Sequence, residues 1–202
     1  MGKTYKLNKS ELTRMKQEEK IYLQFLPVLK LKQEQLQIEQ IRTRKEYLLL
    51  EDDYNNLIAK SLKYSRFLPD RSNPYNLEQL LTPDKISIIK KSVAGVYIPV
   101  LEHVSFQGWA INFFDAPCWL AMVSDDLKAL VIKNIKIQII KKQYELISKE
   151  LKKATQKVNL FEKVLIPETK SAIKRINIVL GDEQVAAVGR AKTAKNKTAG
   201  VM

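Results

Sequence analysis

Large apolar side chains recur at alternating steps of three and four residues through the first third of the chain. The series begins at Leu12 and ends at Tyr64. A spacing that averages 3.5 residues is the coiled-coil period, so it predicts one long helix with a single buried face, here called the seam. A helix of this length would extend roughly 80 Å and cannot bury such a face on itself. The seam residues that we predict are Leu12, Met15, Tyr22, Leu26, Leu29, Leu36, Tyr47 and Leu50.

The same period returns in the last third of the chain, where no glycine occurs between Trp119 and Leu180. This second helix is the partner that the first one needs, because the two have similar lengths. Its predicted seam residues are Tyr144, Ile147, Leu151, Val158, Phe161 and Leu165. We therefore expect an elongated, all-α fold in which the N- and C-terminal helices form an antiparallel two-helix coiled coil.

A proline lies within each predicted helix, Pro27 in the first and Pro167 in the second. Proline removes a backbone hydrogen bond and crowds the preceding turn, so each position predicts a kink. If Leu12 lies opposite Val179, the two prolines fall at nearly the same height. We therefore predict a bend shared by both helices.

The middle of the chain breaks the helical pattern. Residues 68–118 contain five of the seven prolines, together with Gly95 and Gly108. Residues 77–81 suggest a short helix, and the β-branched and aromatic run from Val93 to Phe106 predicts a small strand or β-hairpin. Pro99 confines that strand to an edge or a bulge.

These patterns divide the chain into segments of one elongated unit, 1–202. The N-terminal coiled-coil helix covers 7–67, the insert 68–118 and the C-terminal coiled-coil helix 119–180, which Gly181 is expected to end. Residues 181–202 form a small, basic tail that we expect to be flexible.

The net charge of +13 lies on the helices and not on the insert. Residues 6–66 carry thirteen basic and nine acidic side chains, and residues 119–180 carry thirteen basic and six acidic ones. Such an excess favours an acidic partner surface or a nucleic acid. Interleaved Lys and Glu are also typical of a solvated coiled-coil exterior.

The sequence offers few residues for catalysis or cofactor binding. One histidine, His103, and one cysteine, Cys118, cannot make a zinc site by themselves. The phosphate-binding patterns GxxxxGK[ST] and GxGxxG are absent, which argues against nucleotide binding. We expect no cofactor, no metal and no enzymatic activity, and no apolar run is long enough to insert into a bilayer.

Several local patterns resemble the D subunit of the rotary V-type and archaeal-type ATPases. They are Leu12-Thr13-Arg14, Gly95-Val96 followed by Ile98-Pro99 and Glu102, and Lys157-Val158-Asn159-Leu160-Phe161-Glu162 before Ile166-Pro167. The basic tail, with Arg190, Lys192 and Lys195, is similar too. Pro27 and the Ala- and Gly-rich end depart from the family pattern.

The resemblance implies a central-stalk rotor shaft that transmits torque between a catalytic hexamer of A and B subunits and the ion-translocating rotor in the membrane. It implies a companion stalk subunit (F), a socket subunit of the membrane rotor, and a location at the cytoplasmic face of the membrane. Candidate contacts with the hexamer are Thr13, Arg14, Arg175, Arg190, Lys192 and Lys195. Candidate partner contacts on the hairpin are Val93, Gly95, Val96, Ile98, Pro99 and Glu102.

Two other classes of function stay open on the sequence. A basic coiled coil could bind nucleic acid, although no basic block or recognition motif is present. A structural coiled-coil assembly protein could pair two copies through the same seam. Two helices of matched length with a compact connection favour pairing within one chain.

Overall fold

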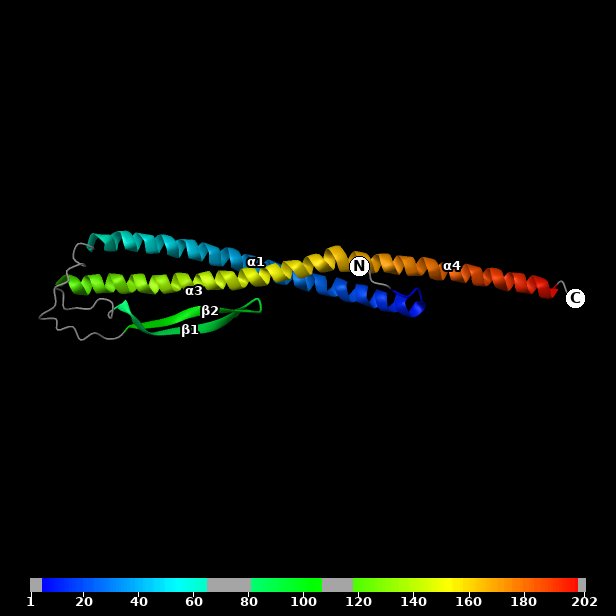
Figure 1. The fold of residues 1–202 in the computed structure, drawn as a ribbon, viewed down its shortest axis with the longest axis horizontal. Helices are drawn as coiled ribbons and strands as arrows, with labels where there is room; N and C mark the ends of the chain where they lie inside the picture. Colours follow the sequence, from blue (N-terminus) through cyan, green and yellow to red (C-terminus); the bar gives the residue numbers. More distant parts are fainter. Residues whose placement is uncertain (1–4, 65–80, 107–117, 200–202) are drawn as a thin grey trace. The chain divides into compact units, whose positions relative to one another are not determined.

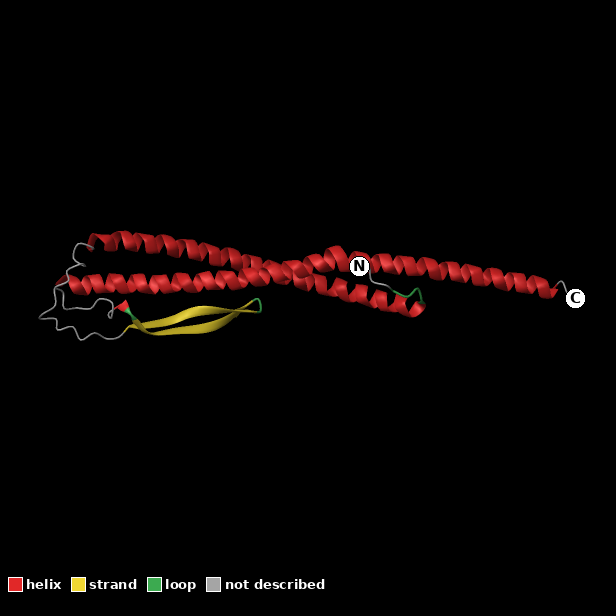
Figure 2. Cartoon of the chain, viewed as in Figure 1, coloured by secondary structure: helices red, strands yellow, loops and turns green. Residues whose placement is uncertain are grey.

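A computed structural model describes residues 5–64, 81–106 and 118–199. The described elements are mostly helical (Figure 1, Figure 2): α1 spans Lys9–Ser61, α3 spans Cys118–Leu160 and α4 spans Ile166–Ala199. A π-helix, Phe161–Leu165, joins α3 to α4, and a short 3₁₀-helix, Leu62–Tyr64, follows α1. Strands β1, Pro83–Val93, and β2, Val96–Phe106, form the sheet.

The chain divides into two compact units that share α1 and α3. One unit, here the terminal unit, contains Met1–Gln33 and Lys153–Met202. The other, here the hairpin unit, contains Glu34–Lys152. In both units α1 runs antiparallel to the second helix, as predicted. Lys30 contacts Glu162 in the terminal unit, and Asp53 contacts Lys133 in the hairpin unit.

The predicted seam positions of α1 lie on the buried side of the helix. Every position of the three-four series from Leu12 to Ser61 is buried or half-buried, including its polar members. Leu36 is fully buried, and so is Ile147 on α3. A lone surface helix would bury a stripe with a period of 3.6 residues, whereas the period of 3.5 residues comes from pairing.

Two hydrogen bonds between polar side chains of α1 and α3 cross the seam at positions where the sequence interrupts its apolar pattern. We call each of these bonds a polar rung. The Gln33 side-chain amide donates a 3.0 Å hydrogen bond to the Thr155 hydroxyl in the terminal unit. In the hairpin unit the Gln40 amide donates to the Ser148 hydroxyl at 2.8 Å. Because a slip in register would leave these amides without partners, the rungs specify the alignment of the helices.

The core of the terminal unit lies where α1 meets α4. Met15, Ala172 and Ile176 are buried there, and Tyr5, Leu12, Ile173 and Leu180 pack against them. The fully buried Ile176 was not among the predicted seam residues. Ile176 follows the π-helix Phe161–Leu165, which shifts the buried face of α4 by one residue.

The insert contains a hairpin, as predicted, but its first strand begins earlier than the sequence indicated. β1 pairs with β2 from Pro83↔Phe106 to Val93↔Val96, with two irregularities in the register. Ala94 and Gly95 form the turn with φ of 49° and 77°. These positive values explain the glycine, because only glycine adopts them without steric cost. Residues 77–80 of the predicted short helix lie outside the described residues.

The second helix differs from its predicted range of 119–180 at its C-terminal end. Gly181 does not end the helix, since α4 continues to Ala199. The glycine does not adopt a positive φ, and the alanine-rich sequence beyond it favours helix. The N-terminal helix also begins and ends inside its predicted range, at Lys9 and Ser61.

Candidate functional site

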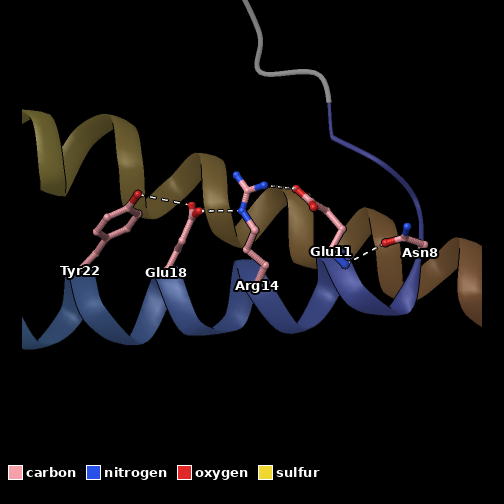
Figure 3. Close-up of polar contacts among 5 residues, drawn as sticks. All are labelled: Asn8, Glu11, Arg14, Glu18 and Tyr22. Carbon is pink, nitrogen blue, oxygen red and sulfur yellow. Dashed lines mark hydrogen bonds and ion pairs between the residues drawn. The ribbon is translucent and has the colours of Figure 1, made fainter.

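The N-terminal end of α1 carries a line of polar contacts on one side of the helix (Figure 3). Asn8 caps the helix, its side-chain oxygen accepting the Glu11 backbone N–H at 2.8 Å. Arg14 lies 3.6 Å from Glu11 and 3.1 Å from Glu18, and the Tyr22 hydroxyl donates to Glu18 at 3.4 Å. The hydrogen bond with Glu18, helped by both carboxylates, raises the pKa of Arg14. Arg14 is therefore an exposed cation held by its own helix.

Thr13, the neighbouring candidate contact, is also exposed but bonds locally. Its hydroxyl donates a 3.1 Å hydrogen bond to the Lys9 carbonyl one turn earlier. A hydroxyl bonded in this way can still accept a hydrogen bond from a partner, because its lone pairs are not all used.

The other four hexamer-contact candidates lie on α4. Arg175, Arg190, Lys192 and Lys195 are all exposed. Every residue from 182 to 197 is exposed, including Val185 at 74% and Val188 at 56%. The end of α4 thus presents apolar and basic side chains together along one helix.

The hairpin presents two different faces. Val96 and Ile98 are buried at 8% and 7%, whereas Tyr97 between them is 71% exposed. This is the alternation of a strand that covers a core on one side only. Glu102 is exposed, and Gly95 lies at the turn.

Pro99 has a structural role that its sequence position did not reveal. Its carbonyl oxygen accepts a hydrogen bond from the side-chain amide of Gln143 on α3. Proline has no backbone N–H, so at this position β2 can contact α3 only through the carbonyl oxygen and the ring of Pro99. The contact attaches the strand to the helix.

A cavity of about 300 Å³ lies in the hairpin unit, where both helices and β2 meet. Its walls include Leu49 and Asp53 of α1, Val100 and Leu101 of β2, and Ile139 of α3. The Asp53 carboxylate in this wall is ion-paired with the Lys133 ammonium at 3.0 Å.

A second apolar series on α1 was missed by the sequence reasoning. Ile38, Ile41, Leu48 and Leu49 are 50% to 69% exposed, with gaps of three, seven and one residues between them. On a helix they lie on the side away from the buried Leu36 and Thr43. We call these four residues the outer stripe. The four residues are visible in the sequence, but they lie outside the seam series.

The described residues contain no group of three or more His, Cys, Asp or Glu side chains placed to hold a metal ion. In the same ranges, no helix has the length and hydropathy that crossing a bilayer would require. The features that the structure does bring forward are surfaces: the end of α4, the hairpin and the outer stripe.

Known proteins of one family are similar to this sequence along nearly the whole chain. A sequence model of the family described as the D subunit of ATP synthase matches residues 11–196. The D subunit of a V-type ATP synthase from Borreliella burgdorferi is 35% identical over 195 residues, covering 95% of this chain and 93% of its own. Proteins of the same name from Chlamydia trachomatis serovar L2 and Chlamydia pneumoniae are 32% and 28% identical. They cover 98% and 96% of this chain and 97% and 90% of their own.

Proposed function

The chain belongs to the family of ATP synthase D subunits, and we infer that it is the central-stalk rotor shaft of a V-type ATPase. In this role it transmits torque between a catalytic hexamer and the ion-translocating rotor of the membrane. The observation that carries the inference is the family match from residue 11 to residue 196, which includes both helices and the hairpin.

The antiparallel helix pair supports a mechanical role. A shaft must resist sliding of one helix along the other when torque is applied. The amide-to-hydroxyl rung between Gln33 and Thr155 opposes such sliding in the terminal unit, and that between Gln40 and Ser148 does so in the hairpin unit. Apolar contacts alone are non-directional and would permit slip more readily.

We propose that the chain has no active site and that nucleotide hydrolysis or synthesis takes place on the A and B subunits of the hexamer. The exposed basic side chains of α4 then lie within the hexamer cavity, with Arg175, Arg190, Lys192 and Lys195 facing its walls. Long-range attraction to acidic walls is screened by salt and does not lock one geometry, which suits a surface that must turn.

The hairpin unit is proposed to bind the companion subunit (F) through the outer stripe and the exposed face of the hairpin. Exposed isoleucine and leucine side chains of this size and spacing are typical of a face that another protein covers. The socket subunit would attach the shaft to the membrane rotor, which places the chain at the cytoplasmic face as a peripheral subunit.

Reconstitution of the ATPase tests the proposed role. A complex assembled without this chain is expected to lose ATP-driven ion transport, and re-addition of the chain restores it. Normal coupled transport in a complex shown by mass analysis to lack the chain would refute the inference.

Charge reversal tests the hexamer contacts separately. The triple variant Arg175→Glu, Arg190→Glu and Lys192→Glu is expected to assemble poorly or to hydrolyse ATP without full transport. Lys142→Glu, an exposed reversal in the hairpin unit, is the matched control. Equal coupling in both variants would remove α4 as the contact surface.

The companion contact is tested on the outer stripe. Ile41→Ser together with Leu48→Ser is expected to weaken binding of the purified companion subunit by tenfold or more. Each change removes apolar surface that the companion would cover in the complex. Gln37→Ser, an exposed neighbour, is the control. Unchanged affinity measured by calorimetry would place the companion elsewhere.

A further inference from the structure

Two interruptions of the helical backbone face each other in the terminal unit. The Tyr22 ring packs edge to face against Phe161, with centroids 5.4 Å apart, and the Lys30 ammonium lies 3.0 Å from the Glu162 carboxylate. Pro27 lies between Tyr22 and Lys30 on α1. It therefore lies across from the start of the π-helix.

Both helices lose regular hydrogen bonds over this stretch. Pro27 has no N–H for the carbonyl of Leu23, and Pro167 has none for that of Lys163. Just before Pro167, the Ile166 N–H donates to the Phe161 carbonyl five residues earlier, which is the hydrogen bond of a π-helix. The axial hydrogen bonds that keep a helix pair straight are thus weakened on both partners.

The π-helix contains one residue more than a regular continuation of the seam would need. Ile147, Ala154 and Phe161 are seven residues apart, and the next members would be Glu168 and Arg175, which are exposed. The buried positions are Thr169 and Ile176 instead, at 7% and 0%. The extra residue is accommodated in the π-helix, a turn less favourable than an α-helical one.

The π-helix contains no fully buried side chain, and its inward-facing Phe161 and Leu165 are half-buried. None of its five residues is buried, although Val158 before it and Ile166 after it are. A cavity of about 340 Å³ lies beside it, with Met15, Leu165 and Pro167 among its lining residues. Few buried contacts and missing axial hydrogen bonds are the features of a segment with low local stability.

We propose that Pro27, the π-helix Phe161–Leu165 and Pro167 form a compliant joint, at which the helix pair yields under torque while the paired segments on both sides stay rigid. The location of the joint comes from the structure, and its part in rotation rests on the proposed shaft function.

Two variants of the full-length chain stiffen the joint by different routes. Pro27→Ala with Pro167→Ala restores two N–H donors without changing the chain length. Deletion of Val164 removes the extra residue and leaves Thr169 and Ile176 in phase with the seam of a continuous α-helix. Gln24→Ala with Glu168→Ala, both at exposed neighbouring positions, is the matched control.

The free protein provides the first readout. Amide hydrogen exchange of residues 19–31 and 158–170 is expected to slow by about three- to tenfold in both stiffened variants, as expected for regained hydrogen bonds. Spin labels at Lys157→Cys and Lys170→Cys, in a Cys118→Ala background, should give a narrower distance distribution. Exchange and distance width equal to those of the control would overturn the joint.

The assembled ATPase provides the second readout. Single-molecule rotation of complexes with stiffened shafts is expected to show smaller angular fluctuation within each dwell. If the complex forms and the fluctuation is unchanged, the joint has no part in rotation. If no complex of any variant contains the chain, the proposed function fails, while the exchange result still decides whether the joint exists.

Discussion

Gln143 of α3 donates a hydrogen bond from its side-chain amide to the carbonyl oxygen of Pro99 on β2. Gln143 is 9% exposed, so neither its amide nor the accepting carbonyl is freely hydrated. A two-stranded hairpin is marginally stable alone and needs a surface to pack on. This bond and the buried Val96 and Ile98 attach it to the helices.

Removal of this attachment is expected to loosen the hairpin and not the helices. Gln143→Ala should lower the free energy of unfolding by about 1–3 kcal/mol, because the Pro99 carbonyl loses its hydrogen-bond donor. Amide exchange should accelerate across β1 and β2, with helical circular dichroism unchanged. Gln138→Ala, at an exposed position of α3, is the control. Loss of helical signal in Gln143→Ala would show that the hairpin supports the helix pair.

The rung in the hairpin unit predicts different outcomes for single and double substitutions. Ser148→Ala should destabilise the protein by about 1 kcal/mol, because it leaves the Gln40 amide half-buried without its acceptor. The double variant Gln40→Leu with Ser148→Ala should be at least as stable as the wild type. It should also allow more than one register between α1 and α3. Denaturant titration measures the first effect, and disulfide trapping between introduced cysteines on α1 and α3 measures the second. A single trapped register in the double variant would contradict the role of the rung.

The buried end of the terminal unit should depend on Ile176. Ile176→Ala removes a fully buried side chain beside Met15 and is expected to cost about 2–5 kcal/mol. Ile178→Ala, at a position that is 54% exposed two residues away, should have little effect. Thermal unfolding of the two variants tests the comparison, and equal stability would mean that Ile176 is not part of the core.

The exposed end of α4 should become more stable when its glycines are replaced. A Cβ added at Gly181 or Gly189 would meet no atom within 4 Å, and neither residue has a positive φ. Each change to alanine should therefore stabilise the local helix by up to about 1 kcal/mol. Ala187→Gly should have the opposite sign. Amide exchange of residues 182–199 provides the measurement, and slower exchange in Ala187→Gly would contradict the argument.

The seam and the hairpin were predictable because both depend on local spacing. A three-four series identifies a helix face without knowledge of its partner, and the Gly95 turn needs positive φ wherever it lies. The helix bounds were less accurate. Gly181 was expected to end the second helix, but a glycine that keeps helical φ only lowers the stability of the helix and does not end it.

The structure adds the surroundings of the candidate contact residues, which remain predictions. The sequence identified Arg14 as a basic residue, but its pairing with Glu11 and Glu18 is a matter of side-chain position. The outer stripe could have been found by scoring a second series on the same helix. The shared bend also stays a prediction, now with Pro27 across from a π-helix rather than across from Pro167.

The sequence by itself determined that two helices carry matching 3.5-residue faces and that a proline- and glycine-containing insert separates them. These are properties of spacing and backbone chemistry, which act over a few turns. Only the tertiary structure decided that Ile176 and not Arg175 enters the core, and that Gln143 binds the Pro99 carbonyl. Both depend on contacts between residues far apart in the chain, where one extra residue in a helical turn changes which side chain is buried.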